Sequence, residues 1–370
     1  MTDDRAWQAP SGALPPPSAA PVASAAWAPP PKPGLIPLRP LDLGTLLGAS
    51  FRVIRRNPRP TFGVALLVQL IATVIPFALG AFGVGFALAR VDQATTSDHG
   101  AILAGAVGLG VVSALGAVVL AIVANAWLQG IIVLEVARSS VGEKLTLRQL
   151  WQRARGRMGA LLGWSLIVAA ALIIAIALIA GVITVLVVSL GPLGIGLGIL
   201  VGILGGLGLL VLGVWIGVKV ALVPSALMLE RLSLAASIRR SWHLTNQAFW
   251  RTFGILILVW FILSLASGII TTPFSILAPL LLTLLDPNAT GSGIGIGAAV
   301  AVYGVQLLVT VVIGAISAVI QSASTALIYL DLRMRKEGLD LTLTKYVEAR
   351  QTGSLDLADP YHQPDAAYGT

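Results

Sequence analysis

The chain of 370 residues contains no cysteine, and only 11% of its residues are charged. The lack of cysteine excludes disulfides and thiolate chemistry. Its three histidines, His99, His243 and His362, lie too far apart to match the ligand spacing of a metal site. The sequence also lacks the HExxH, phosphate-loop and nucleophile-elbow motifs. These absences predict a protein without enzymatic activity, cofactor or metal.

Hydrophobic residues, in contrast, make up 56% of the chain, and long uncharged runs recur through its middle. A helix needs about 20 apolar residues to cross a membrane. Six stretches meet that requirement: 61–89, 101–134, 158–190, 195–223, 252–285 and 298–330. The sequence therefore predicts an all-α, polytopic membrane protein with six crossings.

The basic residues fall on one side of this predicted topology. There are 24 of them, 19 Arg and 5 Lys, and 23 lie on the side that carries both termini, whereas Arg90 lies on the other. The positive-inside rule then places both termini in the cytoplasm. A net charge of +8 on a membrane protein favours anionic lipid headgroups as partners over nucleic acid. The preference for Arg over Lys is also typical of a GC-rich genome.

The two ends of the chain differ from its middle. Residues 1–34 contain nine prolines, and acids stand where a signal peptide needs cations. This composition predicts a disordered tail, partly in the polyproline II conformation. Trp7 and Trp27 stand beside prolines and either dock in an aromatic-lined groove or belong to a plain linker. Residues 346–370 are predicted to form a second cytoplasmic tail.

Three segments that precede the odd-numbered crossings resemble one another: LDLGTLLGASFRVIRRNPRPTFG (41–63), LTLRQLWQRARGRMGALLG (145–163) and LSLAASIRRSWHLTNQAFWRTFG (232–254). Each begins Leu-x-Leu, with Asp42, Thr146 or Ser233 as a predicted N-cap. Thr146 and Gln149 match a capping box. Apolar residues then recur at helical spacing.

These segments predict short amphipathic helices in the headgroup layer, with the apolar face toward lipid. The alternative is a set of ordinary helices packed on the bundle, and both can hold together. The cations expected to face lipid headgroups are Arg52, Arg55, Arg56, Arg59, Arg148, Arg153, Arg155, Arg157, Arg239 and Arg240.

The even-numbered crossings end alike, with an acid after aliphatic residues: Glu135, Glu230 and Asp331. Because arginines cluster nearby, we expect ion pairs that fix the helix ends. The pattern predicts three copies of one helix-pair unit, at about 41–135, 145–230 and 232–331, within a membrane domain that spans 35–345. A fourth interfacial helix, LTLTKYVEAR, follows the third unit.

Two stretches, IPLRPLDLGTLLGASFRVIRRNPRPTFG near the start and TALIYLDLRMRKEGLDLTL near the end, carry a family resemblance. Over residues 35–345 the chain resembles bacterial membrane proteins related to the membrane domain of glycerophosphoryl diester phosphodiesterases. The resemblance implies a six-helix module in a bacterial plasma membrane. It does not imply the hydrolase activity, which resides in a separate barrel domain.

Polar and small residues inside the crossings are further candidates. Asn125, Gln129, Lys219 and Gln321 are expensive to bury in lipid. They either form interhelical hydrogen bonds or surround a polar site for a lipid headgroup or small solute. Lys219 has a third option, which is to snorkel to the interface. The glycines expected to form a helix-packing face, and not a phosphate loop, are Gly194, Gly198, Gly202 and Gly206.

We therefore expect a non-enzymatic membrane scaffold or accessory protein that organises lipid or protein partners. The alternative is a transporter or lipid-handling protein with a polar site between the repeats. An intramembrane enzyme would require Glu230 and His243 to meet around a metal ion.

Overall fold

The computed structural model describes residues 34–91, 99–285, 293–352 and 358–362, and these residues form helices and connecting segments without any strand. The predicted N-terminal tail, including Trp7 and Trp27, lies outside the described residues. The elements are α1 (Leu43–Arg56), the π-helical turn η1 (Arg59–Gly63), α2 (Val64–Val91), α3 (His99–Ser140), α4 (Leu147–Leu190), α5 (Pro192–Val220), α6 (Val223–Leu229), α7 (Leu234–Thr245), α8 (Phe249–Leu285), α9 (Gly293–Glu337) and α10 (Leu339–Gln351).

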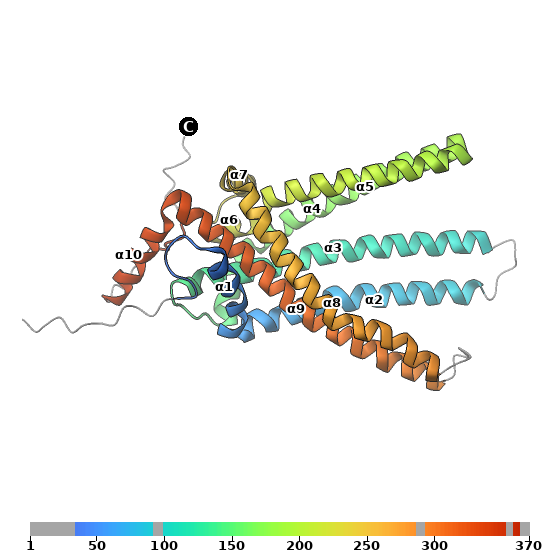
Figure 1. Cartoon of the computed structure of the whole chain (residues 1–370), viewed down its shortest axis with the longest axis horizontal. Coiled ribbons are helices and arrows are strands. Elements are labelled where there is room, and N and C mark those ends of the chain that lie inside the picture. The colour runs from blue at the N-terminus through green and yellow to red at the C-terminus, as the bar shows by residue number, and fades with distance from the viewer. Residues whose placement is uncertain (1–33, 92–98, 286–292, 353–357, 363–370) are drawn as a thin grey trace, which may run out of the picture.

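Six helices in the described ranges are long and apolar enough to cross a membrane, as predicted. They form three hairpins, α2 with α3, α4 with α5, and α8 with α9, which spread apart from one common end (Figure 1). α4 alone has 44 residues, or about 66 Å at 1.5 Å per residue. Because the hydrocarbon layer is about 30 Å thick, a large part of such a helix must lie beyond it.

The common end, here called the base, consists of α1, α6, α7 and α10 together with the adjoining ends of α3, α4 and α9 (Figure 1). Residues 130–141, 222–230 and 322–334 are buried in unbroken runs. A helix that is buried on all sides lies at the centre of a packed structure. The core therefore sits in the base, where the three even-numbered crossings end.

The helices that were expected to start each repeat pack around this core. α1 packs on α9, α4 on α3, and α7 on α6. The predicted N-caps are confirmed, since the side chains of Asp42 and Ser233 accept from the backbone N–H three residues on. Thr146 and Gln149 form the predicted capping box. These caps satisfy backbone donors that have no partner within a helix.

Three of the four glycines that were predicted to form a helix-packing face on α5 do face α4. A Cβ atom at Gly194 would lie 1.9 Å from the Leu186 carbonyl oxygen of α4, and Gly198 and Gly202 also face α4. Gly206 faces open space, and Gly205 lies against Ile179 instead. With 3.6 residues per turn, a four-residue spacing drifts around the helix, so after three steps the contact has moved to the preceding residue. The assignment of Gly206 was wrong for this reason.

Candidate functional site: polar clusters in the base

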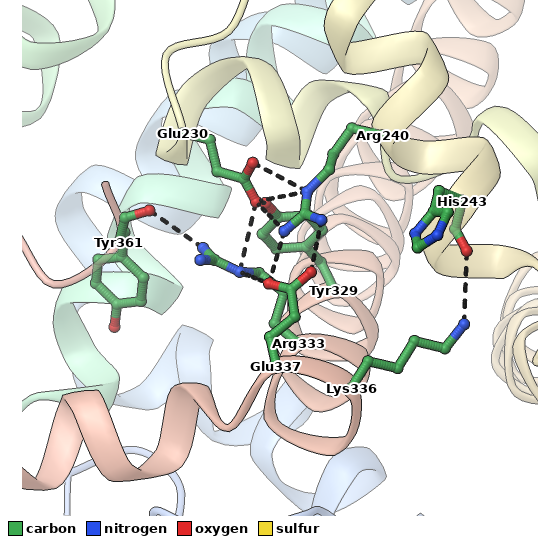
Figure 2. A network of polar contacts seen from close by, with 8 residues as sticks. All are labelled: Glu230, Arg240, His243, Tyr329, Arg333, Lys336, Glu337 and Tyr361. Atoms are coloured by element: carbon green, nitrogen blue, oxygen red, sulfur yellow. Dashed lines mark hydrogen bonds and ion pairs between the residues drawn. The ribbon is translucent and has the colours of Figure 1, made fainter. Parts of the chain in front are cut away.

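The largest polar cluster joins α6, α7 and α9 around Glu230 (Figure 2). The Arg240 Nε lies 3.0 Å from both carboxylate oxygens of Glu230, and its Nη1 lies 2.5 Å from Glu337 Oε1. Arg333 Nε lies 3.0 Å from Glu337 Oε2 and 3.4 Å from Glu230 Oε1. The Tyr329 hydroxyl also donates to Glu230. Two carboxylates and two guanidinium groups thus balance each other, and all of them except Glu337 are buried.

Ion pairs hold the Arg240 guanidinium in its charged form. Burial alone would lower the pKa of Arg240, but the hydrogen bonds to Glu337 and Glu230 outweigh it and raise the pKa above its usual range. Buried guanidinium and carboxylate groups are stable when the bonds are paired and bidentate, as here. The cluster therefore fixes the start of the turn after α6, the middle of α7 and the end of α9 against one another.

A second cluster surrounds Asp331 in α9. Its Oδ1 accepts from the Leu41 backbone N–H at 2.8 Å and from Arg335 Nε at 2.9 Å. Its Oδ2 lies 2.8 Å from Arg251 Nη2 at the start of α8. Both arginines also donate to the Leu41 carbonyl. This cluster ties the segment before α1 to the third hairpin. The two clusters together confirm the predicted ion pairs at Glu230 and Asp331.

Glu135 is bound differently. Its Oε1 accepts from Asn57 Nδ2 and Ser139 Oγ, both at 3.1 Å, and Asn57 also donates to the Leu145 carbonyl. The other oxygen, Oε2, is buried and has no hydrogen-bond partner among the described residues. Neutral donors therefore take the place that arginines take at Glu230 and Asp331.

Residues 358–362, which the sequence assigns to a tail, pack into the base. The Tyr361 side chain is 1% exposed, and its hydroxyl lies 2.5 Å from the Ala137 carbonyl and 2.8 Å from Ser140 Oγ. Burial raises the pKa of this hydroxyl, so it remains a donor. Arg138 pairs with Asp359 and lies over the Tyr361 ring. Residues 358–362 are thus anchored to the last turns of α3.

His243 lies apart from Glu230, with Arg240 between them, and its carbonyl faces Lys336 at 3.5 Å (Figure 2). Within the described ranges, no group of three or more His, Asp or Glu residues is placed to hold a metal ion. The arrangement that an intramembrane metalloenzyme would need at these two residues is therefore not formed.

The four predicted intramembrane polar residues do not form one site. Asn125 and Gln129 of α3 line a cavity of about 410 Å³ with Trp164 and Ser165 of α4. Asn125 donates to the Ala121 carbonyl of its own helix. Lys219 instead lies in the base beside α7, with its Nζ 3.4 Å from Asn246 Oδ1. Gln321 is exposed on α9. Asn125, Lys219 and Gln321 lie ten or eleven residues before the acids that end their crossings, but this shared spacing does not bring them together.

Most of the ten predicted lipid-facing cations are exposed, namely Arg52, Arg55, Arg59, Arg148, Arg153, Arg155 and Arg239. Arg56 and Arg157 are half-buried, and Arg157 donates to the carbonyls of Arg231 and Leu232. Arg240 contradicts the prediction, because it is 4% exposed and bound to two carboxylates. α7 turns Ser237, Arg240 and Ser241 inward, since its polar face packs on the clusters of the base.

Sequence reasoning missed several members of these clusters. Glu337 follows Arg333 by four residues, a spacing that indicates a helical ion pair and could have identified it. Asn57, Asp359 and Tyr361 gave no comparable signal, because each reaches its partner across long sequence separations.

Neither the comparison with curated proteins nor the comparison with solved structures gives a match to this chain. The profile described as a domain of unknown function, DUF7847, matches residues 41–332, which is most of the chain, and the protein therefore belongs to that family.

Proposed function

We propose that this protein is a non-enzymatic scaffold or accessory protein of a bacterial plasma membrane that organises lipid or protein partners. The observation that carries the proposal is the separation of the three hairpins. In the most apolar 18-residue stretch of each candidate membrane-spanning helix, between 0% and 17% of the residues are buried. The hairpins therefore present most of their apolar surface to lipid or to the helices of a partner, while the base holds them in place.

We also propose that the base lies on the cytoplasmic side, at the membrane surface. The helices α1, α4 and α7 each expose one aromatic residue there: Phe51 is 44% exposed, Trp151 46% and Trp242 39%. Aromatic residues and cations together are typical of the membrane interface. Arg90, in contrast, stands in the last turn of α2, at the far end of its hairpin. This charge asymmetry supports cytoplasmic termini.

The three-repeat interpretation is part of the proposal. The first helix of each unit packs on the last crossing of the preceding unit, and α1 packs on α9, so the contacts run in a ring. Phe51 and Trp242 also occupy the same position when 41–63 is aligned with 232–254. The relation to the membrane domain of glycerophosphoryl diester phosphodiesterases stays a prediction, which the family match does not test.

The absence of cysteine allows a direct test of the scaffold. Single cysteines replace Phe82 of α2, Val188 of α4 or Ile269 of α8, all strongly exposed, and carry a photoactivatable crosslinker in native membranes. We expect one protein to be crosslinked in stoichiometric yield from at least one hairpin. Ala169→Cys, at a position that is 2% exposed, is the control. Crosslinks to lipid alone from all three hairpins would contradict a protein scaffold.

A second candidate, a transporter or lipid-handling protein, is favoured by the cavity between α3 and α4. Gln129 lines this cavity and has no hydrogen-bond partner among the described residues. An unpaired side-chain amide within a membrane raises the free energy of the folded protein by roughly several kcal/mol. A ligand oxygen would satisfy it. Replacement of Asn125 and Gln129 by alanine should abolish movement of a fluorescent phospholipid across reconstituted vesicles if this candidate is correct. A scaffold should keep its crosslinked partner in the same variant.

A further inference from the structure

A groove on α7 gathers positive charge, and no ion pair with a carboxylate of the described residues neutralises its cations. The groove has a volume of about 440 Å³ and is lined by Ala235, Ile238, Arg239, Trp242, His243 and Asn246. Arg239, Trp242 and His243 are exposed at its surface. The groove thus combines a cation, an aromatic ring and hydrogen-bonding groups.

Two lysines from distant parts of the chain converge on this groove at Asn246. Lys219, in the last turn of α5, is 7% exposed, and its Nζ lies 3.4 Å from Asn246 Oδ1 and 5.3 Å from the centre of the Trp242 ring. Lys336 of α9 donates to the Asn246 carbonyl at 2.6 Å. Both ammonium groups therefore reach the same residue at the end of α7.

No carboxylate in the described part of the chain forms an ion pair with Lys219, Lys336 or Arg239. Glu337, which follows Lys336 directly, interacts with that lysine only at longer range, because its carboxylate forms ion pairs with Arg240 and Arg333. A lysine that is buried in this way without an ion-pair partner is costly, since a neutral amide oxygen and a ring compensate only part of the hydration that its ammonium group loses. An anion in the groove would complete the arrangement.

Apolar surface continues from the groove along α5. Trp215 lies one turn before Lys219 and packs edge-on against Trp242, with ring centroids 5.6 Å apart. Val211 and Leu212, one turn further along, are more than half exposed. Tryptophan is typical of the level where headgroups meet acyl chains. The cations and the apolar track therefore match the two ends of one phospholipid.

We propose that this groove binds the phosphate group of an anionic phospholipid, with Lys219, Lys336 and Arg239 around the phosphate and an acyl chain along Trp215 and Leu212. The inference deepens the proposed function and rests on it in one respect, which is the position of α7 at the membrane surface. It goes further because it assigns one binding site to named residues and one class of ligand, an anionic phospholipid, to that site.

Native mass spectrometry of the purified full chain, titrated with phosphatidylglycerol or phosphatidylcholine, tests the site. We expect the wild type to retain phosphatidylglycerol preferentially. Each cation near a membrane surface contributes roughly a fivefold change in affinity, so Lys219→Gln with Lys336→Gln should weaken binding about 25-fold. Arg155→Gln removes an exposed cation of α4 outside the groove and should change binding about fivefold at most.

A second variant separates binding from folding. Without lipid, Lys219→Met should unfold at the same temperature as the wild type or higher, because it removes a buried charge, yet it should lose the stabilisation by phosphatidylglycerol. Equal retention of the two lipids, or unchanged binding in the double variant, would overturn the site. Displacement by excess inorganic phosphate would overturn the assignment to a lipid. A variant that loses the lipid but keeps its crosslinked partner leaves the scaffold intact, so the two proposals fail separately.

Discussion

The base and the three hairpins are stabilised in different ways. In the base, residues 130–141, 222–230 and 322–334 are buried without interruption, and ionic clusters join helices that are far apart in sequence. In the hairpins, large apolar side chains such as Phe82, Val188 and Ile269 are exposed, and the pairs spread apart away from the base (Figure 1). Directional contacts therefore specify the tertiary structure of the base, whereas the arrangement of the hairpins depends on the lipid or partner helices around them.

The largest expected effect comes from breaking the cluster that distinguishes the base. Glu230→Gln leaves Arg240 and Arg333 with one carboxylate in a buried site, and removing one partner of a buried ion pair costs about 3–5 kcal/mol. We expect the midpoint temperature of thermal unfolding, measured by circular dichroism in mild detergent, to fall markedly. The matched control is Arg155→Gln, an exposed arginine of α4 outside the cluster, with an effect within about 0.5 kcal/mol. Equal midpoints for the two variants would show that the cluster does not hold the base together.

Tyr361 tests whether residues 358–362 belong to the base. Tyr361→Ala empties a fully buried aromatic site and should cost about 3 kcal/mol. Tyr361→Phe keeps the ring and removes only the hydroxyl that binds Ala137 and Ser140, for a loss of about 1 kcal/mol. Both values follow from unfolding midpoints in the same detergent. If Tyr361→Ala proved as stable as the wild type, residues 358–362 would be an attachment and not part of the core.

Local patterns predicted the helices and their starts well, because hydrophobic runs and caps are properties of neighbouring residues. The N-caps Asp42, Thr146 and Ser233 and the acids Glu230 and Asp331 were identified from sequence alone. The inward turn of Arg240 was not, since periodicity defines the faces of a helix but not which face a neighbour covers. The docking of Tyr361 was missed for a related reason, because its partners in α3 lie more than 200 residues earlier.

A pair of adjacent glycines tests the contacts within a hairpin. Gly205→Leu places a side chain against Ile179 of α4, whereas Gly206→Leu places it in open space. Overpacking should cost the first variant about 1–3 kcal/mol and leave the second close to the wild type. Spin labels on cysteines that replace Leu178 and Leu207 report the separation of α4 and α5. We expect a longer and broader distance distribution for Gly205→Leu alone, and identical distributions would contradict the close approach of the helices at Gly205.

The smallest effect concerns the boundary between the two regions, at the start of α4. Thr146 and Gln149 satisfy each other's backbone N–H groups where the helix leaves the base, and Thr146→Ala should cost about 1 kcal/mol. Thr146→Ser keeps the oxygen and should remain close to the wild type in the unfolding midpoint. Because the rest of α4 extends for many turns, the loss should be confined to its first turns, where hydrogen exchange should become faster. Faster exchange along the whole helix would mean that the hairpin relies on this cap, and that the base and the hairpins fold as a single unit.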